Sequence, residues 1–581
     1  MDRIRWTVMA LGGAAMASGA FAVTGPGIPK VTFAAAEVGK RVVQITGLTE
    51  RVPKGMMFQG YFMVFNNRCN RIDVFDLTDP HKPKTISSFT QSGQGDDHTV
   101  PTAGTMVMDG GTLTDMADPA NPKVVGRNAG FYGSVWPAFQ WPYFYSTRSY
   151  DDANAKSSPL YIVDYSNPGA AGKQVNQIDV QSKLGFTTGS TQAIGNLLMV
   201  TSGDQYAGIS VWDMGDPVHP TLISATKTGP EMYTSQMYGK YVVSTGPQNL
   251  GTVGFFDISN PESIKLEWQE SIPNMGDYAG FQNGFMFGGK IGGGKWIKYD
   301  LAARKTVLTG TIPNYSTSRY VYPIGNMLFV GDPGRDGPNG QNSMCDIYAH
   351  QENPDSIGPT VLFADPPDGA IHQPLSSRIG IAFDEDIDNR LLDPAHLSIR
   401  PKDGAPIPGV YGQSNGVVNF TPAQPLKLNT TYEVVLAPGA IKDWTGNANA
   451  LGYMLRFSTG ATVDGGPASG IRPGPRAMWR ARTRLLAESL PGRSALLLTF
   501  KDGLDVSAAS VAGSAGSRAE VELSDLAGRS LAHARVPMGD LRNGWVWDWA
   551  QGRAAPKGFF VVRMSSGGLR FSRQVMLGAG S

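Results

Sequence analysis

The sequence predicts an all-β protein, a seven-bladed β-propeller followed by two β-sandwich domains. A strand-and-turn unit recurs through residues 30–356, and short alternating strands with many turn residues follow it. Glycine and proline are abundant, at 72 and 40 of 581 residues. Hydrophobic residues make up 41% of the chain, which is enough to bury real cores and excludes wholesale disorder. The balance of 50 basic and 49 acidic residues excludes a nucleic-acid binder that works through bulk positive charge.

Residues 1–22 have the pattern of a secretory signal peptide. Arg3 and Arg5 precede an apolar stretch that closes with Ala20-Phe21-Ala22, a sequence typical of a cleavage site. An uncleaved membrane anchor is the alternative. No other stretch remains apolar for about 18 residues, so we expect no transmembrane segment after signal removal. The expected location is therefore extracellular or at the outer cell surface.

The repeated unit of residues 30–356 is an apolar strand that ends in Asp and leads into a turn with proline. The clearest copies are residues 72–80, 160–168, 209–217 and 253–261. The anchor positions, spaced by 39 to 49 residues, are Asp76, Asp115, Asp164, Asp213, Asp257, Asp300 and about position 349. Each copy follows a predicted hairpin, and a period near 40–50 residues is typical of propeller blades. Seven units predict seven blades.

The repeated Asp has two interpretations. A ring of carboxylates could bind metal, or each Asp could shape its own turn. We expect the second, because an Asp at a strand end can accept the backbone N–H two residues on and set the following turn. One such residue in every blade is what the fold itself would require.

Doubled prolines follow several of these Asp residues, in residues 79–83, 118–122 and 216–220. Together with the repeated strand, they resemble the LVIVD-repeat β-propeller family over residues 50–356. The resemblance implies a bacterial or archaeal surface protein, commonly one without an assigned activity. The copies near Asp300 and position 349 depart from the family pattern.

Residues 357–460 predict a β-sandwich, because short alternating strands are separated by turn residues every ~8–12 positions. Their motifs, in residues 365–369, 420–422, 443–447 and 457–459, resemble in order the bacterial Ig-like domains of S-layer and surface proteins. The resemblance implies a spacer or an adhesion module without catalysis. The acidic cluster 384–388 could bind calcium. We expect a solvated turn instead, because its carboxylates lack the spacing of a dedicated calcium loop.

Residues 461–477 predict a Gly/Pro linker, and residues 478–581 a last β-sandwich. Strands are expected at residues 496–500, 519–523, 545–549, 559–564 and 571–576. With the motifs at 525–529 and 556–563, this order resembles the C-terminal sorting domains of type IX secretion. A plain structural sandwich is the alternative. From residue 476 on there are 15 Lys and Arg against 8 Asp and Glu, which indicates either envelope anchoring or a solvated basic face.

One face of the propeller, where second strands connect to third strands and blades connect to one another, is the expected ligand-binding face. The predicted binding residues are Asp96, Asp97, His98, Arg148, Asp204, Gln205, Lys290, Arg335 and Asp336. Residues 96–98 are the best candidate for metal binding or acid–base chemistry, and a polar loop is the alternative. No cofactor is expected, apart from calcium, for which residues 332–339 offer oxygen ligands but not the spacing of an EF-hand loop. Cys69 and Cys345, in the first and last blades, could form a disulfide or remain buried thiols.

No fingerprint of a serine hydrolase, zinc protease, P-loop or dinucleotide site occurs in a plausible context, so no catalytic residue is predicted. The leading hypothesis is a non-enzymatic surface or secreted protein whose propeller binds a protein or polysaccharide at the cell surface. The Ig-like domain would be a spacer, and the last domain a sorting or attachment device. The alternatives are an extracellular propeller hydrolase or lyase with a cation-assisted channel site, and a self-assembling structural envelope component.

Overall fold

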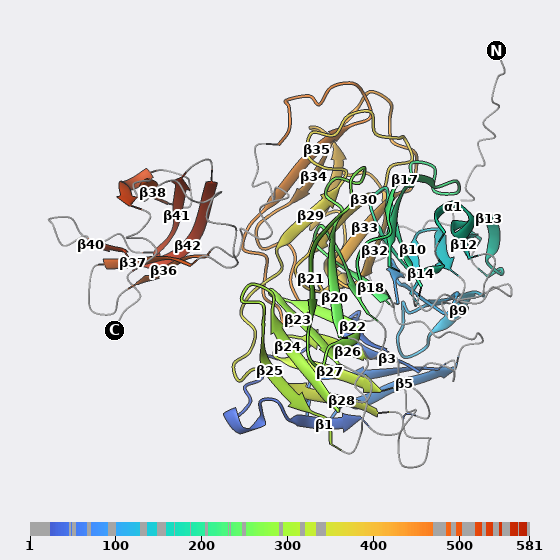
Figure 1. Ribbon diagram of the computed structural model, residues 1–581, viewed down its shortest axis with the longest axis horizontal. Helices are drawn as coiled ribbons and strands as arrows, with labels where there is room; N and C mark the ends of the chain where they lie inside the picture. Colours follow the sequence, from blue (N-terminus) through green and yellow to red (C-terminus); the bar gives the residue numbers. More distant parts are fainter. Residues whose placement is uncertain are drawn as a thin grey trace. The chain divides into compact units, whose positions relative to one another are not determined.

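The computed structural model describes residues 24–45, 48, 54–66, 71–90, 100–127, 136–147, 158–167, 169–185, 187–203, 207–230, 232, 234–246, 251–289, 294–313, 320–332, 344–468, 484–489, 495–501, 518–525, 530–537, 545–548, 558–566 and 569–577. The expected signal peptide, residues 1–22, lies outside them. The described chain is all-β, as predicted (Figure 1). Its helices are α1 (Val180–Leu184) and two 3-10 turns, η1 (Ala35–Glu37) and η2 (Asn389–Leu391).

The chain divides into two compact units, with the C-terminal strands in the second. The part described contains no helix with the length and hydrophobicity that membrane crossing requires.

Seven four-stranded sheets make up residues 41–349, and each consists mainly of strands consecutive in sequence. The first four sheets are β2 (Lys54–Phe58), β3 (Tyr61–Asn66), β4 (Arg71–Asp76) and β5 (Lys84–Thr90); β6 (Thr102–Ala103), β7 (Met106–Asp109), β8 (Thr112–Asp115) and β9 (Lys123–Gly126); β10 (Ala138–Gln140), β11 (Tyr143–Thr147), β12 (Pro159–Asp164) and β13 (Lys173–Asp179); and β14 (Thr188–Ile194), β15 (Leu197–Ser202), β16 (Ile209–Asp213) and β17 (Thr221–Thr226).

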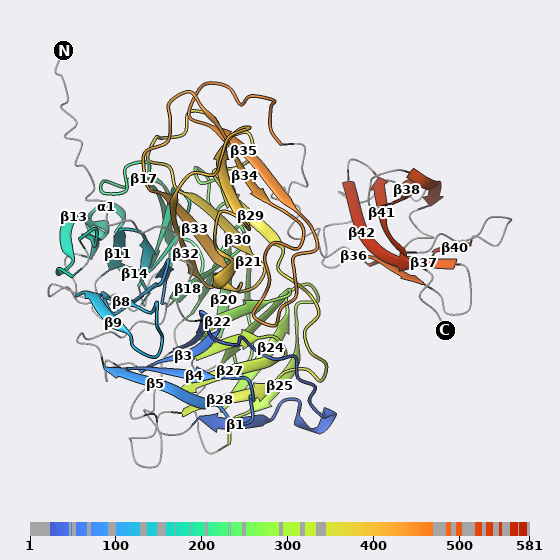
Figure 2. The same cartoon turned by 180° about the vertical axis from the view of Figure 1, so that it is seen from behind.

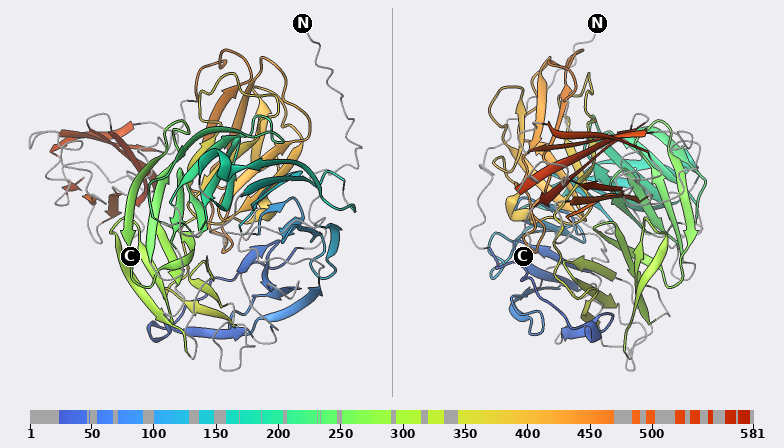
Figure 3. Two further views of the ribbon diagram at one scale, coloured as in Figure 1. Left: turned by 45° about the vertical axis from the view of Figure 1, so that its right-hand side comes forward. Right: turned by 90° about the vertical axis from the view of Figure 1, so that its left-hand side faces the viewer.

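The remaining three sheets follow the same order, except that the last one recruits the N-terminal strand. They are β18 (Thr234–Tyr238), β19 (Tyr241–Thr245), β20 (Thr252–Asp257) and β21 (Lys265–Ser271); β22 (Gly276–Gln282), β23 (Phe285–Gly289), β24 (Lys295–Asp300) and β25 (Lys305–Thr311); and β26 (Tyr320–Ile324), β27 (Met327–Asp332), β28 (Met344–Ala349) and β1 (Arg41–Ile45). The first strands contact one another in succession, β6 with β10, then β14, β18, β22, β26 and β2. Figure 3 shows the sheets from two further sides.

The hydrophobic core lies between the faces of neighbouring sheets. One cluster joins Tyr145 and Leu160 of the third sheet to Leu198 and Trp212 of the fourth, and all four side chains are fully buried. Similar clusters join the second sheet to the third, the fourth to the fifth and the sixth to the seventh. Because both faces of a sheet are covered in this way, inner strands such as β2 and β14 are buried along their whole length, whereas fourth strands such as β5 and β17 are partly exposed.

The third strand of each sheet ends at the position that the repeat predicts, from Asp76 in β4 to Ala349 in β28. The expected role of the Asp is confirmed in five sheets. The Oδ1 atom accepts the backbone N–H two residues on, at 2.7–2.9 Å, in Asp76, Asp115, Asp164, Asp213 and Asp257. These carboxylates therefore shape turns.

Strand β1 completes the last sheet by pairing antiparallel with β28. Val43 lies opposite Ile347, and Ile45 lies opposite Cys345. Without β1, the edge of β28 would be unpaired, which is a liability for aggregation. Cys345 is a free, fully buried thiol, and burial beside Asp346 and Asp73 raises its pKa well above the usual value. Cys69, the partner of Cys345 in the disulfide alternative, lies outside the described residues, so that pairing stays a prediction.

The buried carboxyl of Asp346 in β28 should make the free energy of unfolding depend on pH. Burial raises the pKa of its carboxyl to about 6, against the opposing effects of Arg41 and Tyr348. A pKa raised in the folded state means that the stabilisation is present at about pH 4 and is lost as the pH rises through about 6. Relative to Asp346→Asn, the wild type should lose about 2 kcal/mol of unfolding free energy between pH 4 and 7. Urea unfolding of both proteins across this range measures it, and parallel pH profiles would contradict it.

The second domain follows directly and has two sheets. One contains β29 (Val361–Asp365), β30 (Ile379–Phe383), β33 (Val417–Pro422) and β32 (Gly409–Ser414), and the other contains β31 (Leu397–Pro401), β34 (Thr431–Leu436) and β35 (Tyr453–Ser458). A shared core includes Ile381, Phe420, Val434 and Phe457. The first residues of the expected linker run along this domain, since Ala468 N–H donates to Asp368 at 2.9 Å.

The C-terminal unit also has two sheets. They are β36 (Arg484–Ser489), β37 (Ala495–Lys501) and β40 (Trp545–Asp548), and β39 (Ser530–Pro537), β38 (Arg518–Asp525), β41 (Gly558–Ser566) and β42 (Leu569–Leu577). All five expected strands are present, within a few residues of their predicted bounds. The sequence reasoning missed β36 and β39.

Candidate functional site

The second domain packs against one edge of the seven sheets, seen from behind in Figure 2. We call this edge the turn edge. It carries the turns between first and second strands, residues 59–60, 104–105, 141–142, 195–196, 239–240, 283–284 and 325–326. The opposite edge, where second strands end, is called the loop edge. Since chain direction alternates from strand to strand, the turns between third and fourth strands also lie at the turn edge.

Hydrogen bonds join the second domain to turns of several sheets. Gln59 N donates to Asn389 Oδ1 at 2.8 Å, Gly104 N to Tyr411 O at 2.7 Å, and Asn196 N to Asp365 Oδ2 at 2.7 Å. The domain therefore does not extend away from the sheets as the expected spacer would. Its residues satisfy backbone groups of the turn edge, which a spacer would leave to water.

Asn419 of β33 makes three hydrogen bonds across this interface. Its Oδ1 accepts Gly195 N at 2.8 Å and Gln140 Nε2 at 2.9 Å, and its Nδ2 donates to Ala193 O at 3.0 Å. The residue is buried, so each lost partner would leave an unsatisfied polar group. Asn419 thus joins the third and fourth sheets to the second domain.

Backbone meets backbone at two glycines of the interface. A Cβ atom on Gly380 of β30 would lie 2.2 Å from Gly195 N, and one on Gly412 of β32 would lie 2.3 Å from Thr102 O. No side chain fits at these distances. Only glycine at these two positions lets the two backbones approach so closely.

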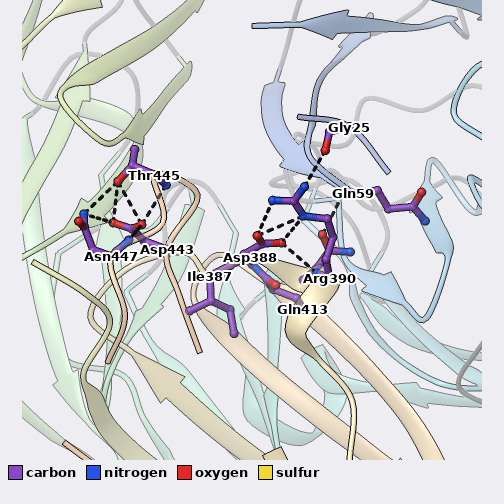
Figure 4. Close-up of polar contacts among 10 residues, drawn as sticks. Gly25, Gln59, Ile387, Asp388, Arg390, Gln413, Asp443, Thr445 and Asn447 are labelled. Atoms are coloured by element: carbon purple, nitrogen blue, oxygen red, sulfur yellow. Dashed lines mark hydrogen bonds and ion pairs between the residues drawn. The ribbon is translucent and has the colours of Figure 1, made fainter. Parts of the chain in front are cut away.

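The N-terminal segment crosses the same interface. Arg390 Nη1 donates to Gly25 O at 2.6 Å, while its Nε and Nη2 bind Asp388 at 2.6–3.1 Å (Figure 4). Ile28 N donates to Trp444 O at 3.3 Å, and Lys30 Nζ to Asn447 Oδ1. Residues 24–33, which precede β1 in the chain, therefore also hold the second domain in place.

The acidic cluster 384–388 contributes to this interface, so the prediction that it forms a solvated turn is wrong. Glu385 and Asp388 are buried, and Asp386 accepts hydrogen bonds from Tyr322, Gln413 and Gly416 N. The local run of acidic residues suggested exposure, but the seven sheets cover it, and Tyr322 of the last sheet donates to Asp386.

A small cavity of about 30 Å³ lies beside this cluster. Its lining comes from both domains and includes Lys54, Tyr278, Tyr320, Tyr322, Asp386 and Asn415. Lys54 Nζ donates to Asn415 Oδ1 at 2.9 Å, and burial lowers its pKa to about 8. Such a volume holds water, whereas organic ligands occupy cavities of about 300–1,000 Å³. The cavity therefore does not serve as an organic ligand site in this conformation.

Three buried carboxylates meet where the second domain begins. They are Asp355, Glu385 and Asp443. Each contributes one carboxylate oxygen, and these three oxygens lie within 4.8 Å of one another. Burial and then the neighbouring carboxylates raise the pKa of Glu385 well above its usual value, and burial likewise raises the pKa of Asp443. Within the part of the chain described, this is the group whose donor set could hold a metal ion.

Residues 355–459 match the family model of the bacterial Ig-like domain. The resemblance seen in the sequence is thereby confirmed for the second domain, which is called the Ig-like domain from here on. No curated protein sequence matches the chain. An Ig-like domain of this family indicates a bacterial surface or extracellular protein.

The binding residues predicted from sequence lie outside the described residues. They are Asp96, Asp97, His98, Arg148, Asp204, Gln205, Lys290, Arg335 and Asp336. Five described strands precede these nine residues, β5, β11, β15, β23 and β27, and all five end at the loop edge.

Sequence reasoning missed the carboxylate cluster, because its members are 30 and 58 residues apart along the chain. One signal was present, the oxygen-bearing side chains at alternate positions Asp443, Thr445 and Asn447. In the structure, Asp443 accepts hydrogen bonds from both of the others, as Figure 4 shows. The other two carboxylates have no comparable local pattern.

Proposed function

We propose that the protein is a secreted or cell-surface binding protein, whose seven sheets are the blades of a β-propeller of the LVIVD-repeat type. The contact of successive first strands and the completion of the last sheet by β1 support the propeller interpretation. The signal-like residues 1–22 support export, and the basic C-terminal unit is proposed to sort or attach the protein at the envelope.

One observation carries the proposal, namely that the Ig-like domain covers the turn edge. Its hydrogen bonds to Gly104, Gly195 and Asn196 occupy the turns at that edge. A partner of the propeller would then bind at the loop edge, where rigid strands end and the predicted polar and charged residues follow. The proposed ligand is a protein or polysaccharide of the cell surface, and no catalytic role is assigned.

The test compares cations at the two edges in the full chain. Arg148, Lys290 and Arg335, which follow strands that end at the loop edge, are replaced together by Ala. The matched control replaces Lys82, Lys123 and Lys265, which are exposed near the turn edge. The probes are purified bacterial surface polysaccharides in an array and labelled surface proteins of the producing cells.

Binding should weaken at least about tenfold in the loop-edge variant and remain unchanged in the control. Equal binding by both variants would overturn the proposal, and so would binding that the isolated C-terminal residues 478–581 reproduce. Release of shortened saccharides by the wild type would indicate a hydrolase or lyase instead.

A further inference from the structure

Three distant segments bring Asp355, Glu385 and Asp443 together. Asp355 lies between β28 and β29, Glu385 follows β30, and Asp443 lies between β34 and β35. Their side chains are buried, with residue exposures of 5%, 4% and 3%. Bringing three carboxylates within 4.8 Å of one another away from water is costly unless a positive charge or protons compensate them.

The protein's own donors form hydrogen bonds with two of the three carboxylates. Asp355 accepts hydrogen bonds from Ile357 N at 3.0 Å and from the side chains of Gln282 and Asn283, both at 2.8 Å. Asp443 accepts from Thr445 and Asn447 at 2.8–3.0 Å. These donors are neutral, so they orient the carboxylates without neutralising them.

Glu385 is the exception. Its Oε1 is buried and has no hydrogen-bond partner, although its side chain reaches the other two carboxylates. A buried carboxylate oxygen without a partner calls for an explanation, and a bound cation would supply one.

Two lysines lie near the cluster, and both direct their Nζ elsewhere. Lys298, whose charge interacts with that of Asp355, donates to His350 Nδ1 and Gln351 Oε1 at 3.2 Å each. Lys30 donates to Asn447 Oδ1. Among the described residues, none of the three carboxylates forms an ion pair.

The donor set favours calcium. Carboxylate oxygens are hard ligands, and Ca–O distances of about 2.3–2.6 Å place ligand oxygens up to about 5 Å apart. Magnesium, with Mg–O distances of about 2.1 Å, demands near-ideal octahedral geometry and usually keeps several waters, so it is seldom held by a set of buried protein carboxylates. Water and neutral oxygens can complete a calcium shell of six to eight ligands, as is usual for this ion.

We propose that Asp355, Glu385 and Asp443 bind a calcium ion where the Ig-like domain joins the sheets. Gln282 and Asn283, which hold Asp355, belong to the turn between β22 and β23. The ion therefore links the start and two loops of the Ig-like domain to the turn edge of the sixth sheet. Its role is to hold the domain against the sheets.

The experiment uses the full chain, stripped with a chelator, and CaCl₂ as the probe. Titration calorimetry should show a single calcium site per chain, and thermal unfolding should shift to higher temperature with calcium. Glu385→Gln keeps the shape of the side chain but removes its charge, so it should fold and bind calcium at least about tenfold more weakly. Asp464→Asn, an exposed residue just after the same domain, is the matched control and should bind as the wild type does.

Two results would overturn the proposal. A stripped wild type that neither binds calcium nor changes its unfolding temperature would show that Glu385 is held as a neutral, protonated acid. Equal calcium affinity in the wild type and in Glu385→Gln would place the ion elsewhere. Terbium luminescence adds an independent readout of position, because Trp444 adjoins Asp443 and can sensitise an ion bound there.

Discussion

A chain that begins at residue 46 should fail to fold cooperatively and should aggregate. It lacks β1, so the edge of β28 from Met344 to Ala349 stays unpaired and becomes a template for other chains. It also lacks Ile28 and Phe33, which with Ile45 are buried in the first core cluster. At about 1.5–3 kcal/mol for each of these side chains, the loss approaches the 5–15 kcal/mol of a typical domain.

The control is a chain that begins at residue 23, which removes only the expected signal peptide. Size-exclusion chromatography and thermal unfolding followed by circular dichroism compare the two proteins. A truncated protein that stays monomeric and unfolds within a few degrees of the control would show that β1 is dispensable.

Gly380→Ala should destabilise the protein by about 3 kcal/mol or more and loosen the Ig-like domain. The new methyl group would lie 2.2 Å from Gly195 N and 2.3 Å from Ile194 Cγ1, a backbone atom and a buried side chain that cannot easily move. Inserting a methyl group into a packed interior usually costs about 1–3 kcal/mol, and backbone contact places this site at the upper end. The Asn419 hydrogen bonds lie in the same contact and would be strained with it.

Urea unfolding measures the loss, and limited proteolysis shows whether the Ig-like domain becomes more accessible. Gly439→Ala is the control, because nothing lies within 4 Å of its Cβ position. Its backbone φ of 79° carries a strain of about 1 kcal/mol for a residue with a side chain. Similar losses in both variants would mean that the close approach at Gly380 is not a determinant of stability.

Local chemistry explains which parts of the fold the sequence predicts. An Asp such as Asp76 shapes its own turn through the N–H two residues on, so the signal and its effect lie together in the chain. Because such an Asp recurs from repeat to repeat, the repeat also predicts where the third strand of each sheet ends. The Ig-like domain has a similarly local series of motifs, and its family match confirms it.

Other features depend on contacts between distant segments, which a local pattern does not encode. The acidic residues 384–388 indicate solvent exposure when considered alone, and only the turn edge explains why Glu385 is buried. Likewise, Asn419 has no special sequence context, yet it receives a hydrogen bond from Gly195 in another domain. The predicted binding residues, such as Arg148 and Lys290, are untested and stay a prediction.

The closing strand has a consequence for the order in which the chain is made. Arg41 of β1 leaves the ribosome 305 residues before Asp346, its ion-pair partner in β28. The last sheet is therefore started first and finished last, and a nascent chain carries an unmatched strand throughout the synthesis of the other six sheets. Contacts of such long range slow folding. A chaperone that shields residues 41–45 until residue 349 has emerged would thus act at the most vulnerable point of the protein's biogenesis.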